Sequence, residues 1–310
     1  MILLVGYVVY YSAMNKTSKV KKAVIPAAGL GTRFFPATKT IPKEMLPLVD
    51  KPIILYVIEE AIQAGIEDIV LIQGRGKTAI EDFFDISYEL EDKFAKEGKS
   101  HLLESLNHIR KNANIVSIRQ KSALGLGHAV LCAKPVVGEE PFAVLLGDEI
   151  TISKDPQNNV TKFLSDQYEK TSQSSVWVLP VNKEDVHKYG IIDLGKNINQ
   201  LDQGGAVKGV VEKPTAENAP SHWALPGRYI FDSKIFRILS ETKAGKNGEI
   251  QLSDAMHELA LSGTLNAYSF AAQRFDAGDK LGFLIATVEF ALKREDLGGG
   301  FREYLKTLNL

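Results

Sequence analysis

The stretch AVIPAAGLGTRFFPATKTIPKEMLP, residues 23–47, combines glycines, cations and prolines in one loop. A hydrophobic run leads to Gly29 and Gly31, where the lack of a side chain lets backbone N–H groups approach phosphate oxygens. Arg33 and Lys43 follow, and a loop stiffened by prolines could direct both cations at one polyphosphate. The loop therefore indicates a phosphate site, and a tight turn with two solvated cations is the alternative.

Two well-known phosphate loops are excluded. The dinucleotide-binding fingerprint requires a third glycine where Phe34 stands, and no helical pattern follows directly. The P-loop requires a Gly-Lys-Ser/Thr ending that the sequence lacks. An NAD-dependent enzyme is therefore disfavoured.

The composition limits the partners. Among 310 residues, 37 lysines and arginines nearly balance 38 aspartates and glutamates, and hydrophobic residues make up 45%. This balance argues against a nucleic-acid coat and a polybasic membrane anchor, so a globular protein would bind an anion at a local site. Cys132 is the single cysteine, which excludes an intrachain disulfide and a cysteine-rich zinc site and fits the cytoplasm.

The first dozen residues are apolar but carry no pattern for export. They are shorter than the roughly 20 residues of a membrane-spanning helix, and no basic region precedes them as in a signal peptide. Either Met14 is the true initiator, or residues 1–19 form a genuine N-terminal extension. In both cases we expect this segment to carry no chemistry.

The candidate residues need a scaffold, and the hydrophobic pattern predicts an α/β sheet. Buried parallel strands are expected from four apolar runs: KAVIPA, EDIVLIQ, NIVSIRQ and FAVLLGDE. Segments with helical period separate these runs, and the segment IILYVIEEAIQAG ends at Gly65 as a helix C-cap would. Such alternation is typical of crossover units in a single sheet.

After Asp148 the pattern changes. Short turns replace the long helices, which predicts an antiparallel elaboration of the same sheet. The strand-like pieces are SSVWVLPV, GIIDL, NINQLDQ, AVKGVVEKP and WALPGRYIFD. No repeat and no low-complexity linker interrupts the chain, so a single domain is favoured.

The pattern returns to helices in GEIQLSDAMHELALSG and DKLGFLIATVEFALKRED. One face of the second helix is apolar and carries Leu281, Leu284, Ile285 and Val288. After the glycines at 298–300, a last amphipathic piece is suited to pack on the body or on another subunit. Its apolar positions are Phe301, Tyr304, Leu305 and Leu308.

Taken in order, the motifs resemble those of one family. AAGLGTRFFPATKTIPKEMLPLVDKP is similar to the signature loop of the bacterial UTP:glucose-1-phosphate uridylyltransferases, within the wider sugar-nucleotidyltransferase family. The similarity covers about residues 20–295 in the family's order. It continues through RQKSALGLGHAVLCAK, FAVLLGDE, KYGIID, GVVEKP, PGRYIFD, GEIQLSDA and FDAGDKLGF.

The resemblance implies a three-layer, Rossmann-like nucleotidyltransferase fold of the α/β class. Its central sheet would be mixed and mainly parallel, with an antiparallel sugar-binding elaboration. A single domain is implied over residues 20–310. Within it, residues 20–150 would bind the nucleotide, residues 151–275 would bind the sugar, and residues 276–310 would form C-terminal helices.

The resemblance also implies roles for the loop. Arg33 and Lys43 would face the triphosphate, and Glu44 would either lie near the nucleoside or hold Lys43 in place. Gln120 and Gly125 would read the base, because an amide both donates and accepts and a glycine backbone can lie close against a ring. An unspecific loop is the alternative for this pair. Backbone contacts to the nucleotide are implied for Ala27, Ala28, Gly29 and Gly31.

Asp148 ends the run FAVLLGD, at the edge of an open α/β sheet where ligands bind. The resemblance makes Asp148 and Asp276 the magnesium ligands, with a turn residue and a helix cap as the alternatives. Two carboxylates suffice, because Mg²⁺ completes its octahedron with phosphate oxygens and water. Glu149 stands where many relatives carry another aspartate, so a sugar contact at this position is an open point.

Three residues map to the sugar phosphate: Gly190, Glu212 and Lys213. A carboxylate can accept hydrogen bonds from two neighbouring hydroxyls, and an ammonium can pair with the phosphate. A surface Glu-Lys-Pro turn is the alternative for the last two. Arg228 and Tyr229 are expected as structural supports, and all six histidines as non-catalytic.

The implied reaction transfers the uridylyl group of UTP to glucose 1-phosphate and yields UDP-glucose and pyrophosphate. Arg33, Lys43 and Lys213 would act on the phosphates, and Mg²⁺ would be the cofactor. A homodimer or homotetramer without nucleic-acid or membrane partners is expected. Thymidylyl transfer stays open, because uracil and thymine differ by a methyl group that hydrogen bonds do not detect. A catalytically idle nucleotide-sugar-binding regulator predicts the loss of a metal aspartate or a loop cation, and none is missing.

Overall fold

The computed structural model of the chain describes residues 18–195, 201, 204–245 and 248–308. Residues 1–17 of the predicted N-terminal extension lie outside the described residues, as does the strand expected in NINQLDQ, apart from Leu201. No described helix is long and apolar enough to cross a membrane.

Four parallel strands form one half of an 11-stranded sheet within the described residues. In spatial order they are β5 (Asn114–Arg119), β4 (Asp68–Gln73), β1 (Lys22–Ala27) and β6 (Phe142–Leu145). They coincide with the four predicted runs, because β1, β4 and β6 are continuous apolar segments buried on both faces. All four end at the same edge of the sheet, where the ligand-binding residues were expected.

The other half of the sheet is largely antiparallel and belongs to the same layer. The added strands are β8 (Ser174–Pro180), β9 (Gly190–Asp193), β10 (Gly205–Ala206), β11 (Gly209–Glu212), β12 (Trp223–Leu225), β13 (Arg228–Phe231) and β14 (Leu265–Ser269). β13 runs antiparallel to both β6 and β8, whereas β14 joins β8 in parallel. The predicted mixed sheet is confirmed, and parallel pairing is concentrated in its first half.

A separate two-stranded ribbon brings the two metal candidates to one place. β7 (Glu149–Ser153) pairs antiparallel with β15 (Ala272–Asp276), and their register sets Asp276 opposite Glu149. Asp148 directly precedes β7. A second short hairpin, β2 (Pro47–Leu48) with β3 (Lys51–Pro52), closes the loop after β1.

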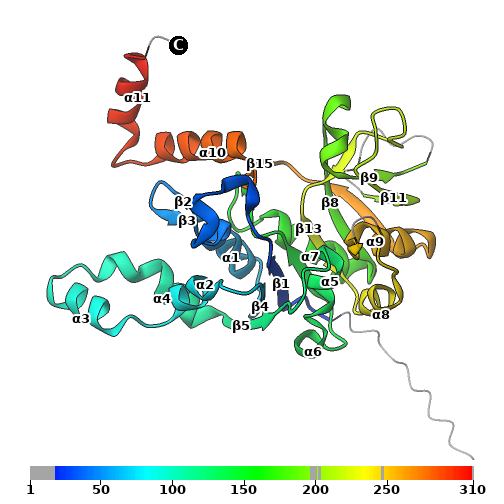
Figure 1. The fold of residues 1–310 in the computed structure, drawn as a ribbon, viewed down its shortest axis with the longest axis horizontal. Coiled ribbons are helices and arrows are strands. Elements are labelled where there is room, and N and C mark those ends of the chain that lie inside the picture. The colour runs from blue at the N-terminus through cyan, green and yellow to red at the C-terminus, as the bar shows by residue number, and fades with distance from the viewer. Residues whose placement is uncertain (1–17, 196–200, 202–203, 246–247, 309–310) are drawn as a thin grey trace, which may run out of the picture.

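Helices cover both faces of the sheet and make three layers (Figure 1). α1 (Ile53–Gln63) and α7 (Val160–Thr171) pack on one face, in the hydrophobic cluster that contains Ile25. The opposite cluster contains Val24, so adjacent residues of β1 serve opposite faces, as the strand period of two requires. The helices on that second face are α5 (Leu126–Leu131), α6 (Lys134–Val137), α8 (Lys234–Glu241) and α9 (Leu252–Leu261).

α1 ends at a glycine, as the sequence indicates. Gly65 adopts a left-handed φ of 88°, and the N–H of Ile66 donates to the carbonyl of Ala61 at 3.1 Å. This bond satisfies a carbonyl that the end of the helix leaves free, and the chain turns directly into β4.

The remaining segments are short helices. Between β4 and β5 the chain forms α2 (Thr78–Phe84), α3 (Tyr88–Lys96), the 3-10 helix η4 (Ser100–Leu103) and α4 (Glu104–Asn112). Another 3-10 helix, η5 (Lys183–Lys188), precedes β9. The proline-rich loop contains no α-helix, as expected from its prolines. Its turns are the 3-10 helices η1 (Thr32–Phe34), η2 (Ala37–Lys39) and η3 (Lys43–Met45).

Two helices end the described chain, α10 (Lys280–Lys293) and α11 (Gly298–Lys306). Figure 1 shows α11 standing away from the sheet, beside α10. The predicted apolar face of α10 is exposed, because α10 packs on the body through its other side. That inner side carries Phe283, Ala286 and Phe290. The glycines at 298–300 form the first turn of α11 and do not precede the helix, which corrects the expected boundary.

A buried ion pair joins the layers. Arg228 Nη2 in β13 lies 2.8 Å from Glu60 Oε2 in α1, and the two side chains are 1% and 5% exposed. Thr151 Oγ1 and Thr161 Oγ1 each donate to the same carboxylate at 2.7 Å. With its charge matched and its oxygens bonded, Glu60 holds α1, α7, β7 and β13 together. This contact agrees with the supporting role expected for Arg228.

Candidate active site

The loop after β1 folds around Lys43. Gly31 has a left-handed φ of 66°, and its carbonyl accepts a hydrogen bond from Thr38 Oγ1 at 2.7 Å. A Cβ on Gly31 would lie 3.2 Å from Thr38 and 3.3 Å from the Cβ of Lys43. A Cβ on Gly29 would lie 3.6 Å from the Cε of the same lysine. The two glycines therefore leave room along the whole length of Lys43.

The backbone at the start of this loop is closely approached from the neighbouring strand. Ala27 is the last residue of β1 and is buried, and Ala28 begins the loop. A Cβ on Gly74, just after β4, would lie 3.0 Å from the carbonyl oxygen of Ala28. A glycine at this point lets the two strand ends sit side by side at the edge of the sheet.

Lys43 and Asp148 form the central pair of the site. Lys43 Nζ donates to Asp148 Oδ2 at 2.5 Å, and both side chains are about one-fifth exposed. Burial opposes the charge on Lys43, but Asp148 and Glu44 outweigh it and raise the pKa of the ammonium. Burial also opposes the charge on Asp148, but Lys43 outweighs it and lowers the pKa of the carboxyl. Each partner keeps the other ionised.

Three predicted residues, Arg33, Asp148 and Asp276, meet at Gly278. A Cβ there would lie 2.3 Å from Asp148 Oδ2 and 3.3 Å from Asp276 Oδ1, so the two oxygens are no further apart than the sum of these distances. Arg33 Nη1 donates to the carbonyl of Gly278 at 3.2 Å, and the N–H of Ala277 donates to the carbonyl of Asp148 at 2.9 Å. The structure thus brings together one cation and two carboxylates at a residue without a side chain.

These two carboxylates fit a magnesium ion. The glycine keeps clear the space that any larger residue would fill with its Cβ, and carboxylate oxygens are the ligands that Mg²⁺ prefers. The described part of the chain holds no cluster of three or more His, Cys, Asp or Glu side chains suited to a metal. Further ligands would have to be phosphate oxygens and water, as is usual for Mg²⁺.

Glu44 is buried next to Lys43 in the chain and does not form a hydrogen bond with it. Its side chain is 1% exposed, and Oε2 accepts from Lys77 Nζ at 2.8 Å. Burial raises the pKa of Glu44 and lowers the pKa of Lys77, since each charge has left water. Two roles were expected for Glu44. The hydrogen bonds do not support its role as a direct partner of Lys43, because Lys43 bonds to Asp148.

The structure also brings together the predicted base-reading pair. Gln120 Nε2 donates to the carbonyl of Gly125 at 3.1 Å. Gly125 has a φ of 93°, and a Cβ there would lie 2.9 Å from the carbonyl oxygen of Ile250. Only glycine fits this position without strain, because the backbone is both left-handed and crowded.

The three predicted sugar residues are neighbours on β9 and β11. Glu212 is paired with Gly190 in the strand register, and a Cβ on Gly190 would lie 3.4 Å from Glu212 Oε2. Lys213 has a left-handed φ of 45°, and its N–H donates to the carbonyl of Tyr189 at 2.9 Å. Its Nζ lies 3.2 Å from Glu212 Oε1, and the side chain is 59% exposed. Tyr229, expected as a support, lines the hollow beside them.

Comparison with known proteins shows which family the chain belongs to. The family model described as nucleotidyl transferase matches residues 22–291. The chain belongs to the nucleotidyl transferase family. A curated UTP–glucose-1-phosphate uridylyltransferase from Bacillus subtilis (strain 168) is 51% identical over 279 residues, which cover 90% of this chain and 94% of that protein.

Solved structures agree with this assignment. A UTP-bound UGPase from Acinetobacter baumannii has a TM-score of 0.85 and 41% identity, and it covers 94% of this chain and 100% of that one. A UDP-glucose pyrophosphorylase complexed with UDP-glucose has a TM-score of 0.81 and 43% identity, covering 89% and 100%. The predicted fold and family are thereby confirmed.

Two residues of this nucleotidyl transferase site were missed from the sequence. Arg274 donates through Nε and Nη2 to Glu149, and its Nη1 donates to Tyr189 Oη at 2.9 Å. Its Nη2 also lies 3.4 Å from Asp276 Oδ2. Arg274 therefore links the metal candidates to Tyr189, which is next to the predicted sugar residue Gly190, and it holds Glu149 in the interior. Its position two residues before Asp276 in a strand was the available signal, since such residues share a face.

His128 is the other missed residue. Its Nδ1 lies 2.9 Å from Gln120 Nε2, so the imidazole helps to fix the amide of the predicted base-reading pair. Gln120 and His128 are eight residues apart, across a loop and the start of a helix. No sequence pattern predicts a contact at this spacing. The expectation that the histidines are non-catalytic is compatible with this positioning role.

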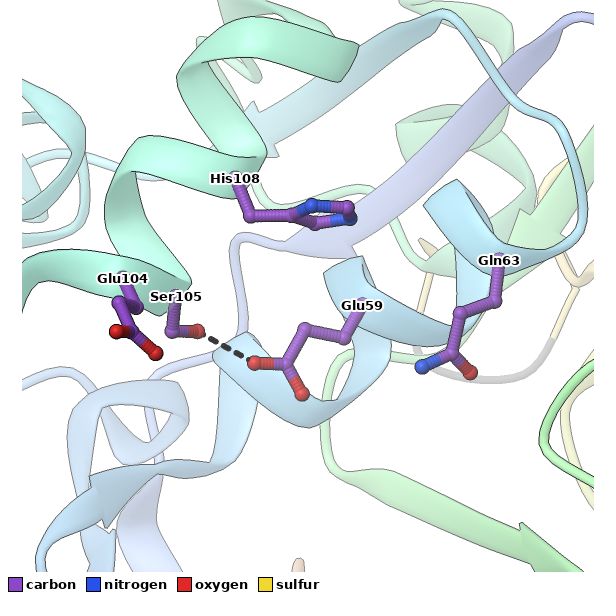
Figure 2. A pocket seen from close by; sticks show the side chains of 5 residues that line it. All are labelled: Glu59, Gln63, Glu104, Ser105 and His108. Atoms are coloured by element: carbon purple, nitrogen blue, oxygen red, sulfur yellow. Dashed lines mark hydrogen bonds between the residues drawn. The ribbon is translucent and has the colours of Figure 1, made fainter. Parts of the chain in front are cut away.

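A second hollow of the nucleotidyl transferase lies between α1 and α4 and takes in none of the predicted residues. Figure 2 shows Glu59, Gln63, Glu104, Ser105 and His108 around it. The Glu59 carboxylate is satisfied, because it accepts from Ser105 Oγ at 2.6 Å and pairs with Lys51. The Glu59 carboxylate at this hollow is therefore already engaged by groups of the chain itself.

Proposed function

We propose that this nucleotidyl transferase moves the uridylyl group of UTP to glucose 1-phosphate and releases UDP-glucose and pyrophosphate. The meeting of Lys43, Arg33 and two aspartates around Gly278 carries the proposal. It combines cations suited to a polyphosphate with carboxylates suited to a divalent metal ion. The names of the relatives, and the UTP and UDP-glucose in two of the solved structures, support the choice of substrates.

In this reaction a phosphate oxygen of glucose 1-phosphate attacks the α-phosphorus of UTP. A new phosphorus–oxygen bond forms, and the bond to pyrophosphate breaks. The attacking group is already an anion at neutral pH, so the chain needs no general base. Its task is to align two polyanions and to offset their repulsion.

The cations of the chain meet these needs. Arg33 and Lys43 would bind the triphosphate and stabilise the charge of the departing pyrophosphate. Lys213 would hold the phosphate of the sugar, and its 59% exposed side chain would exchange its contact with Glu212 for that phosphate. Lys43 is bound to Asp148 in the free protein, so the substrate phosphates would compete with that carboxylate for the ammonium.

Asp148 and Asp276 would hold Mg²⁺ as the cofactor. When bound, Mg²⁺ supplies positive charge to the phosphate oxygens of the reacting groups. Arg274 holds the neighbouring Glu149 through a two-pronged contact, which keeps the end of β7 in place next to Asp148. The contact between Arg274 and Glu149 thus stabilises the backbone next to the proposed metal ligands Asp148 and Asp276.

The proposed parts follow the motifs along the chain. Residues 20–150 bind the nucleotide, with the backbone of residues 27–31, the carboxylate of Glu44 close to the nucleoside, and the base read by residues 120 and 125. Residues 151–275 bind the sugar through Gly190, Glu212 and Lys213. Residues 276–310 supply Asp276 and the C-terminal helices.

We propose a homodimer or homotetramer in the cytoplasm. The exposed apolar face of α10 supports the oligomer, because contiguous apolar surface of this kind marks a protein interface. A second copy of the chain is the proposed occupant. The single free cysteine supports a reducing compartment.

Pyrophosphate release measured in a coupled assay tests the reaction. We expect turnover with UTP, glucose 1-phosphate and Mg²⁺, and loss of turnover when EDTA removes the metal ion. The same assay with dTTP and with galactose 1-phosphate measures the specificity. Faster turnover with dTTP would assign thymidylyl transfer, and no turnover with any pair would contradict an enzymatic role.

A further inference from the structure

Arg274 of β15 is engaged by three other side chains, and its own side chain is only 14% exposed. Nε donates to Glu149 Oε2 at 2.7 Å, and Nη2 donates to the other oxygen of the same carboxylate. Nη1 donates to Tyr189 Oη at 2.9 Å, and Nη2 lies 3.4 Å from Asp276 Oδ2. One guanidinium therefore joins β7, β15 and the residue that precedes β9.

The two bonds to Glu149 fix the guanidinium in place. Glu149 is 7% exposed, and a buried carboxylate without its cation would be left uncompensated at a large cost. A planar guanidinium that is bound in this two-pronged way has one orientation, so the direction of Nη1 towards Tyr189 is set as well. The carbon of the guanidinium also lies 5.0 Å from the centre of the Tyr189 ring, within the range of a cation–π contact. Tyr189 is thus held by its ring and by its hydroxyl.

The backbone of Tyr189 in turn holds Lys213. The N–H of Lys213 donates to the carbonyl of Tyr189 at 2.9 Å, one residue beyond the pairing of Glu212 with Gly190. Lys213 has a left-handed φ of 45°, which a residue with a side chain keeps only where its surroundings hold it. A displacement of Tyr189 would therefore move Lys213.

We propose that Arg274 is a positioning residue, which holds Lys213 through Tyr189 at a fixed place relative to Asp276. The inference rests on the proposed function, in which Lys213 holds the sugar phosphate and Asp276 lies at the phosphates of the nucleotide. Arg274 contacts neither substrate and sets the separation of two groups that do. A misplacement of about 1 Å between reacting groups can cost on the order of 100-fold in rate. Loss of the link should therefore impair turnover and leave UTP binding intact.

Tyr189→Phe removes only the contact between Nη1 and the hydroxyl, and it leaves the aromatic ring and the bonds to Glu149 in place. We expect kcat to fall by about 5- to 100-fold because the sugar phosphate is misaligned, with less than about a twofold change in the KM for UTP. Tyr168→Phe is the matched control, since Tyr168 Oη donates to Asp232 Oδ2 at 3.4 Å outside the site, and its kcat should not change. A wild-type kcat for Tyr189→Phe, or an equal loss in both variants, overturns the proposal.

A double variant tests whether Arg274 and Tyr189 act as one link. Lysine keeps the charge but cannot bind Glu149 through two nitrogens and also reach Tyr189, so Arg274→Lys should lose at least as much kcat as Tyr189→Phe. The double variant should be no slower than Arg274→Lys alone, because the second substitution acts on a link that is already broken. Losses that multiply would show two independent roles and overturn the proposal. If Arg274→Lys does not fold, the result for Tyr189→Phe decides alone.

Isothermal titration calorimetry in EDTA gives a measure that depends neither on turnover nor on a metal ion. We expect the Kd of Tyr189→Phe for UDP-glucose to rise by about 3- to 30-fold, because the phosphate next to the sugar then meets a displaced cation. The Kd for UTP should change by less than about twofold, since that ligand carries no sugar phosphate. A general loss of structure would weaken both ligands alike, and that result overturns the proposal.

The proposed function and this inference fail in different ways. If the wild type does not turn over UTP with glucose 1-phosphate, the proposed function is refuted. If the wild type is active and Tyr189→Phe matches it in kcat and in both Kd values, only the inference is refuted.

Discussion

Lys43 Nζ lies 2.5 Å from Asp148 Oδ2, although one residue belongs to the loop after β1 and the other follows β6. The pair joins the group suited to phosphate with the group suited to a metal ion. Burial disfavours both charges, yet each partner outweighs that effect on the other, which raises the pKa of Lys43 and lowers the pKa of Asp148. In the free protein the two charges neutralise each other, and the substrates and Mg²⁺ would separate them.

Replacement of Lys43 by alanine tests the cation. We expect Lys43→Ala to fold and to lose about 100-fold or more in kcat, because a preorganised cation is then missing in the transition state. Lys21→Ala is the control, since Lys21 forms an exposed pair with Glu67 and should leave kcat unchanged. Arg33→Ala should behave as Lys43→Ala does. Activity within a fewfold of wild type for both would contradict the assignment.

Gly278→Ala tests the space between the aspartates. The added Cβ would lie 2.3 Å from Asp148 Oδ2, so the carboxylate must move, and we expect Mg²⁺-dependent turnover to fall by about 100-fold or more. Gly299→Ala is the matched control, because nothing lies within 4 Å of a Cβ at that position. Titration of Mg²⁺ in the activity assay should give a higher half-saturating concentration for Gly278→Ala alone. Wild-type magnesium dependence in this variant would show that Gly278 does not border the metal site.

The sequence predicts the core strands well because local pattern and burial agree there. β1 matches KAVIPA residue for residue, and Gly65 ends α1 as expected, since a continuous apolar run and a left-handed glycine are each determined locally. The extent of antiparallel pairing was harder to predict. The pairing of β13 between β6 and β8 depends on segments far apart in the chain, and no period within β13 reveals them.

Side-chain partners were the least predictable part of the site. Motifs name Asp148, Asp276 and Lys43, but the partner of Glu44 turns out to be Lys77, which lies beyond α1 and β4. Arg274 was missed although it lies two residues before Asp276, because its partner Glu149 is on β7, far away in the sequence. Such contacts depend on how distant segments meet in the fold, and the identity of each residue alone does not determine them.

The buried pair of Glu60 and Arg228 predicts a large effect on stability. Glu60→Ala would leave Arg228 charged in the interior without its partner, and we expect the free energy of unfolding to fall by about 3–5 kcal/mol. Urea denaturation followed by circular dichroism measures this change. Glu67→Ala, at an exposed pair, should cost less than about 1 kcal/mol. An equal loss in the two variants would mean that the buried pair does not join the layers.

The exposed apolar face of α10 predicts how the protein assembles. Leu284 is 60% exposed in the single chain, between Leu281 and Val288, so a second copy would cover it in a homo-oligomer. A charge placed in such an interface must lose its water without gaining a partner, and we expect Leu284→Asp to be monomeric where the wild type is a dimer or tetramer. Leu261→Asp is the matched control, because Leu261 is 63% exposed at the end of α9 and should not change the mass. Size-exclusion chromatography with light scattering measures both variants, and a monomeric wild type, or a Leu284→Asp variant with the wild-type mass, would exclude this face as the interface.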